Sequence, residues 1–131
     1  RAPGTDPATA AALRRSPDML GAEDFPRDLL DLMGLLGDER IEQGAWSRFR
    51  ATPTATSSPQ IVLLGSSGYS AQVAGQLGLG FGFAPHFDTG GVLEACQLYR
   101  DAFRPSAELP EPYTIVTAGV LAADDPEQAE H

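Results

Sequence analysis

The segment Gly65–Ser70, GSSGYS, joins glycines to hydroxyl side chains directly after the apolar run Ile61–Leu64. Glycine lets a backbone approach an anion, and serine hydroxyls add hydrogen-bond donors. A helical pattern of small residues follows. The start of a helix leaves N–H groups unpaired and carries partial positive charge. The segment therefore predicts a phosphate cradle, with donors from Ser66, Ser67, Gly68, Tyr69 and Ser70.

The same segment has a plainer interpretation, a tight strand-to-helix turn with serine caps and no ligand. It departs from the GxGxxG dinucleotide fingerprint and from the P-loop pattern. The spacing alone therefore names no cofactor, and both interpretations stay open.

Two further residues have side chains suited to a ligand. Arg1 can bind a phosphate bidentately or can be a solvated terminal arginine. His86, in the segment FAPHF, can act as acid, base or hydrogen-bond donor, or can be structural. Tyr99 and Phe103 share a helical stripe with Cys96, and we expect all three in the core.

Composition excludes several classes of function. The net charge is -9, from 18 acidic and 9 basic residues, which argues against binding nucleic acid or an anionic membrane surface. All basic residues are arginine, so no lysine exists for a Schiff base or a Walker motif. No apolar run is long enough to span a membrane. The lone Cys96 cannot form an internal disulfide, and with two histidines a metal site is not expected. We expect a reducing, cytoplasmic location.

The expected elements follow from apolar periodicity and from Gly and Pro punctuation. They are a helix over 8–15, a helix opened by residues 24–26 and ended by Gly37, strand Ile61–Leu64, helix Ser70–Leu77, strand Phe81–Ala84, a helix from Val92 to Phe103, a β-rich run Tyr113–Ala123 and a last helix opened by Asp125-Pro126. The acidic pairs Glu23-Asp24 and Asp124-Asp125 are expected to cap helix starts.

Strands that alternate with helices imply parallel βαβ units. A doubly wound sheet and a (β/α)8 barrel both fit this rhythm, although a whole barrel needs about 250 residues. The chain has 131 residues, one domain or less. In either fold, ligands bind at the carboxyl ends of the strands, where Gly65–Ser70 and Ala84–Phe87 are expected.

Four segments, read in order, resemble the bacterial luciferase-like flavin monooxygenases: RAPGTDPATAAALRRS, LLGSSGYSAQVAGQLGLGFGFAPHF, YRDAFRPS and PYTIVTAGVLAADDPEQA. The resemblance covers most of the chain and is weakest over Asp38–Ser58. It implies an α/β fold whose parallel βα units form part of a (β/α)8 TIM barrel. Residues 1–131 would be a partial domain, from the end of barrel strand 4 through strand 7.

The resemblance also implies a cofactor, reduced FMN or, in relatives, a deazaflavin. The family turn that holds the flavin phosphate matches Gly65, Ser66, Ser67, Gly68, Tyr69 and Ser70. The arginine that matches Arg1 can reach the same phosphate, and the strand end that matches Phe83 and Ala84 lies beside the flavin ring. Pro85 stands where the family often has a second histidine or a small residue, which leaves the role of His86 open.

The implied function is a monooxygenase that uses reduced FMN and O2 to oxidise a small organic substrate. A flavin reductase would supply the reduced FMN, and the full-length protein would be a homodimer. The resemblance assigns no catalytic residue to this chain. Two alternatives remain: a non-catalytic flavin-binding barrel protein, and an inactive fragment of the enzyme. Family members run well over twice this length, so we expect the isolated chain to be poorly stable or to self-associate.

Overall fold

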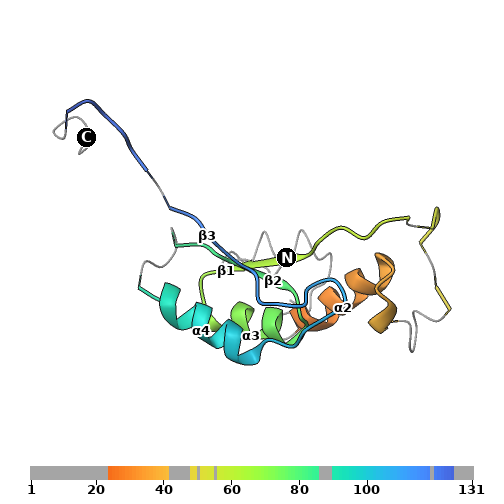
Figure 1. The fold of residues 1–131 in the computed structure, drawn as a ribbon. Coiled ribbons are helices and arrows are strands. Elements are labelled where there is room, and N and C mark those ends of the chain that lie inside the picture. Colours follow the sequence, from red (N-terminus) through yellow and green to blue (C-terminus); the bar gives the residue numbers. More distant parts are fainter. Residues whose placement is uncertain are drawn as a thin grey trace, which may run out of the picture. The chain divides into compact units, whose positions relative to one another are not determined.

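The computed structural model describes residues 24–41, 48–49, 51–54, 56–85, 90–118 and 120–125. The chain divides into two compact units, residues 1–59 and 60–131, which are described separately. Arg1, His86, the expected helix over 8–15 and the helix expected from Pro126 onward lie outside the described residues. The elements (Figure 1) are α2 (Phe25–Leu35), the 3-10 helix η2 (Glu39–Ile41), β1 (Val62–Gly65), α3 (Gly68–Gln76), β2 (Gly80–Phe83), α4 (Val92–Ala102) and β3 (Thr114–Val116).

The first unit contains α2, which confirms the helix expected from residue 24 to Gly37. Leu29 and Met33, one helical turn apart, are buried. Gly37 takes the left-handed conformation, with φ of 85°. The N–H of Asp38 donates to the carbonyl of Met33 at 3.0 Å, so glycine ends α2 in a Schellman motif.

The start of α2 differs from the expectation that Asp24 caps it. Asp24 occupies the N-cap position, but its side chain makes no capping hydrogen bond. Its carboxylate instead pairs with Arg27, with 2.9 Å between Oδ1 and the guanidinium nitrogen. The arginine one turn later therefore competes successfully with the backbone for this carboxylate.

The second unit is built on a parallel sheet with the strand order β1-β2-β3. Leu63 lies opposite Phe81, and Phe81 lies opposite Thr114. Helices α3 and α4 connect the strands, so the chain runs β-α-β-α-β. This arrangement confirms the parallel βα units, and each of the first two strands is displaced by one residue from its expected range.

Both connecting helices lie on one side of this sheet (Figure 1). On that side Leu63, Phe81 and Phe83 are buried, and the rings of Phe81 and Tyr99 are 5.6 Å apart. Alternate residues of a strand point to opposite faces. On the other face β2 carries only Gly80 and Gly82. The neighbouring Leu64 of β1 is 68% exposed, so in this unit the second face is open.

Helices α3 and α4 pack closely because α3 has small residues at the contact. A Cβ built on Gly75 would lie 2.7 Å from the carbonyl oxygen of Tyr99 and 3.0 Å from the Cβ of Ala102. Helix α3 ends at Gly78, where φ is 61°, and the N–H of Leu79 donates to the Ala74 carbonyl at 2.9 Å. Gly78 is therefore the expected stop signal.

The β-rich run expected over Tyr113–Ala123 is largely wrong. Of the residues of this run that the structure describes, only Thr114–Val116 form a strand. The reason lies in its partner, because β2 ends at Phe83 and that residue pairs with Val116. Beyond Val116 the described residues are not in a strand and are exposed. Apolar, β-branched composition does not extend a strand where no partner backbone is available.

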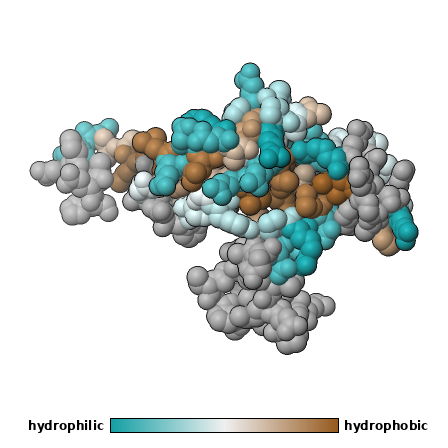
Figure 2. All heavy atoms as spheres, turned by 90° about the horizontal axis from the view of Figure 1, so that it is seen from below, coloured by the Kyte–Doolittle hydropathy of each residue, from teal (hydrophilic) through white to brown (hydrophobic). Residues whose placement is uncertain are grey.

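The core expected around α4 is confirmed for two of three residues. Tyr99 is fully buried and Cys96 is buried as a free thiol. Phe103 is half-buried, with its ring 5.7 Å from that of Tyr99. On the surface viewed from below, hydrophobic side chains gather in patches bordered by hydrophilic ones (Figure 2).

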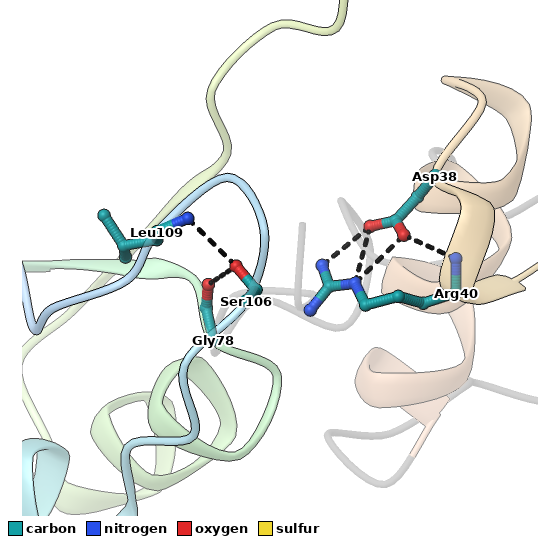
Figure 3. Close-up of polar contacts among 5 residues, drawn as sticks. All are labelled: Asp38, Arg40, Gly78, Ser106 and Leu109. Carbon is teal, nitrogen blue, oxygen red and sulfur yellow. Dashed lines mark hydrogen bonds and ion pairs between the residues drawn. The ribbon is translucent and has the colours of Figure 1, made fainter.

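Two polar clusters fix chain reversals in their respective units (Figure 3). Arg40 binds the carboxylate of Asp38 through its backbone N–H at 2.9 Å and through its guanidinium at 2.7 to 3.2 Å. In the second unit, the Ser106 hydroxyl donates to the Gly78 carbonyl and accepts from the Leu109 N–H, both at 3.1 Å. Each side chain satisfies backbone groups that a turn leaves open.

Candidate functional site

The predicted cradle lies at the carboxyl end of β1, where the strand turns into α3. Ser66 and Ser67 form the turn, and α3 begins at Gly68. The N–H of Ala84 donates to the carbonyl of Gly65 at 3.0 Å. This bond holds the end of β2 beside the end of β1, so it brings together two segments that the sequence placed at one site.

Ser67 is the N-cap residue of α3, with extended backbone angles (φ −137°, ψ 163°). A serine at this position usually accepts a hydrogen bond from the first helical turn. Here its side chain makes no such bond, and the residue is exposed. Helix geometry leaves the N–H groups of Gly68 and Ser70 without partners within the helix. The Ser67 hydroxyl and these N–H groups are therefore donors placed at one helix end.

The charge around this helix end suits an anion. The first turn of α3 contains no acidic residue, so no carboxylate of this turn opposes the positive end of the helix dipole. The donors therefore fit a phosphate group, which is the part of FMN that the cradle was predicted to hold.

Ser70 has a different environment from Ser67. A Cβ built on Gly65 would lie 2.5 Å from the Oγ of Ser70 and 2.6 Å from its Cβ. The half-buried Ser70 side chain thus occupies the space that any larger residue at position 65 would need. Position 65 is therefore restricted to glycine mainly because the Ser70 side chain packs against it. The sequence spacing of these two residues did not predict this close contact.

Sequence reasoning missed one residue that lies against this turn, Leu98 of α4. A Cβ built on Gly68 would lie 2.7 Å from the Cδ1 of Leu98. Leu98 is half-buried and stands one helical turn after the buried Ala95. The spacing of three residues places Leu98 near the buried face of α4, and this was the sequence signal that could have identified it.

The remaining predicted site residues have distinct surroundings. Tyr69, in the first turn of α3, is 44% exposed. Phe83 and Ala84 are buried, and the ring of Phe83 lies edge-on to that of Phe81 at 6.4 Å. Arg1 and His86 lie outside the described residues. None of the helices within the described ranges is long and apolar enough to cross a membrane.

Comparison with known proteins gives relatives along nearly the whole chain, although no family model matches it. The chain is 44% identical over 131 residues to the uncharacterized protein YvbT of Bacillus subtilis (strain 168), covering 100% of this chain and 38% of the relative. It is also 44% identical over 131 residues to a luciferase-like monooxygenase of Escherichia coli (strain K12), covering 99% of this chain and 37% of the relative.

A solved structure gives the same result for the fold. The crystal structure of apo-MsnO8 matches with a TM-score of 0.74 and 30% identity, over 88% of this chain and 33% of that one. The chain thus spans a little over a third of the length of the curated relatives that it matches. Its parallel β-α-β-α-β unit corresponds to part of a luciferase-like barrel, and the chain is homologous to the luciferase-like monooxygenase family.

Proposed function

We propose that the protein carrying this chain is a flavin-dependent monooxygenase, which uses reduced FMN and O2 to oxidise a small organic substrate. The observation that carries this proposal is the 44% identity to the Escherichia coli luciferase-like monooxygenase along 99% of the chain. Because the chain spans only 37% of that relative, the activity belongs to the whole protein. The part assigned to this chain is to hold the cofactor.

The residues that would hold FMN are those of the cradle. The hydroxyls of Ser66 and Ser67 and the first N–H groups of α3 would bind its phosphate. Arg1 would add a cation. Bound reduced flavin would supply the electrons that activate O2. The net charge of -9 does not prevent this binding, because distant surface charges are screened over about 8 Å at physiological ionic strength.

The end of β2 would lie near the flavin ring. The bond from the Ala84 N–H to the Gly65 carbonyl supports this placement, since it fixes Ala84 at the edge of the cradle. The Phe83 side chain is buried on the helix side of the sheet. A ligand at this end would therefore meet the main chain of Phe83 and Ala84 rather than the Phe83 ring.

The phosphate assignment is tested by comparing FMN with riboflavin, which lacks the phosphate. In the protein that carries this chain, Ser66→Ala and Ser67→Ala should weaken FMN binding by about 1.5–3 kcal/mol at most for each lost charge-assisted bond. Riboflavin affinity should stay unchanged. Ser106→Ala is the matched control, because this serine bonds the end of α3 instead. Equal affinities for FMN and riboflavin in the unmodified protein would remove the phosphate assignment.

Oxygen consumption separates the enzyme from the alternative binding protein. Reduced FMN with a panel of small organic substrates should give substrate-dependent O2 uptake. Tight FMN binding without O2-dependent turnover would favour the non-catalytic flavin-binding protein. Repeating the assay with a reduced deazaflavin decides between the two cofactors. We also propose that a flavin reductase supplies the reduced FMN. The whole protein would be a homodimer in the cytoplasm.

A further inference from the structure

We propose that Leu98 is a positioning residue for the phosphate turn: its side chain sets where the N-terminal end of α3 lies, and so how tightly a phosphate binds. This inference rests on the proposed function. The observation behind it is the contact already described, in which the Cδ1 of Leu98 stands 2.7 Å from the place of a Cβ on Gly68. Gly68 is the first residue of α3 and one of the proposed phosphate donors.

The two ends of α3 are held against α4 in different ways. At the C-terminal end, backbone meets backbone, since a Cβ on Gly75 would lie 2.7 Å from the Tyr99 carbonyl oxygen. The Gly75 carbonyl also accepts a 2.9 Å hydrogen bond from the N–H of Arg104. At the N-terminal end, the contact is made by a flexible leucine methyl. The C-terminal end is therefore held against α4 by backbone, whereas the N-terminal end meets α4 through a side chain whose size can be changed.

Helix geometry converts that difference into a displacement at the site. Gly68 and Gly75 are seven residues apart, which is about 10 Å at about 1.5 Å per residue. A tilt of about 5° around Gly75 would move the first turn of α3 by about 1 Å over that length. Hydrogen bonds to a phosphate are directional, and a misplacement of about 1 Å is enough to weaken them substantially.

The other buried contacts of α3 limit the movement but do not remove it. The side chains of Ala71 and Ala74, which are fully buried, are single methyl groups, and the larger Val73 is buried with 9% exposed. Small side chains interdigitate little with the surface that they cover. The side chain of Leu98 is therefore the group that stops the N-terminal end of α3 from tilting toward α4.

The test measures the ratio of FMN affinity to riboflavin affinity in the protein that carries this chain. Leu98→Ala should lower this ratio by about tenfold, because the phosphate donors lose their alignment while the ring site is untouched. Leu93→Ala is the matched control, the same substitution in the same helix at a residue that is 85% exposed. It should leave the ratio unchanged. Leu98→Val, which removes one carbon, should lower the ratio less and serves if the alanine variant folds poorly.

A double variant that enlarges residue 68 and shortens residue 98 gives a second test of the contact. Gly68→Ala should also lower the ratio, because its methyl group would meet Leu98. Combined with Leu98→Ala, the new methyl gains room. The double variant should therefore have a higher ratio than the product of the two single effects predicts. A merely destabilising role for Leu98 would lower the melting temperature without this recovery.

The outcomes separate the inference from the function on which it rests. If the unmodified protein binds FMN and riboflavin equally, the phosphate assignment fails, and the role of Leu98 fails with it. If the unmodified protein prefers FMN but Leu98→Ala and Leu98→Val retain that preference, the role of Leu98 is overturned and the phosphate assignment stands. A reduced ratio for Leu98→Ala, an unchanged ratio for Leu93→Ala and recovery in the double variant support the inference.

Discussion

The backbone N–H of Tyr113 donates a 3.0 Å hydrogen bond to the hydroxyl of Tyr99. That hydroxyl in turn donates to the carbonyl of Leu79, also at 3.0 Å. Tyr99 is fully buried and comes from α4, while Leu79 and Tyr113 precede β2 and β3. One side chain therefore joins a helix to the starts of two neighbouring strands. This end of the sheet lies opposite the turn from β1 to α3, and the two hydrogen bonds of Tyr99 stabilise it.

Removing that hydroxyl should destabilise the protein. Tyr99→Phe leaves a backbone N–H and a carbonyl without this partner, which costs about 1–3 kcal/mol. Denaturant unfolding measures the loss. Tyr113→Phe is the control, because it removes a hydroxyl from a 46% exposed ring and keeps the backbone N–H in place. Equal stabilities of the two variants would contradict the bridging role of Tyr99.

The same residue predicts a loss of stability at alkaline pH. Burial raises the pKa of Tyr99 above its usual value, against a smaller lowering by the N–H of Tyr113. The folded protein therefore releases this proton less readily than the unfolded chain. The protonated Tyr99 hydroxyl contributes fully to the free energy of unfolding below a pH of about 10, the pKa of an unfolded tyrosine. This contribution is lost as the pH rises through the pKa in the folded protein. Unfolding measured from pH 8 to 11 should show a steeper decline for the unmodified protein than for Tyr99→Phe.

Two glycines that end helices should respond differently to alanine. Both Gly37 and Gly78 have positive φ, so each Gly→Ala change costs about 1 kcal/mol or more through backbone strain. A Cβ on Gly78 would also lie 2.5 Å from the carbonyl oxygen of Arg104, whereas a Cβ on Gly37 meets nothing within 4 Å. Gly78→Ala should therefore be clearly more destabilising. Hydrogen exchange of α3 and of α2 amides measures each effect locally, and similar losses would refute the crowding at Gly78.

Acid should weaken the turn after α2. The side-chain hydrogen bond from Arg40 lowers the pKa of Asp38, with burial opposing it. The carboxylate thus stabilises the fold above its unfolded pKa of about 3.9, and the contribution disappears as the pH falls through the lower, folded value. Asp38→Asn should be less stable than the unmodified protein at pH 6, with a smaller difference at pH 3. A difference independent of pH would exclude the charge of Asp38 as its cause.

The open face of the sheet predicts association of the 131-residue chain by itself. Leu64 is 68% exposed there, and Ile115, opposite Gly82 in β3, is 39% exposed. Exposed apolar surface of this kind favours self-association. Leu64→Ser should reduce the mass seen in sedimentation, and Leu93→Ser, in the exposed part of α4, should do so much less. A monomeric chain that melts cooperatively would rule this out.

Much of this architecture was predictable because its signals are local. Gly37 and Gly78 mark the ends of α2 and α3, and the apolar spacing of Ala95 and Tyr99 fixes the buried side of α4. The strand-to-helix turn at Ser66 and Ser67 was predictable for the same reason, since a strand, two serines and a glycine stand next to one another.

The contacts that shape the turn were not predictable in this way. Leu98 contacts Gly68 although 30 residues separate them in the sequence. Nothing in the sequence around either residue indicates which residue it contacts. The length of β3 depends on where β2 ends, a property of the partner rather than of Tyr113–Ala123 itself. Local pattern predicts which element forms, whereas its extent and its neighbours are decided by chain segments far away.

The alternation of glycine and phenylalanine in β2 disfavours a shift in the register between β2 and β1. A shift of one residue against β1 would turn Phe81 and Phe83 out to water and place two glycines under the helices. Each phenylalanine so exposed would forfeit about 1.5–3 kcal/mol of burial. A sheet that forms with a register shift of one residue is thus far less stable than the native sheet. The sequence of the middle strand therefore selects the native register during folding.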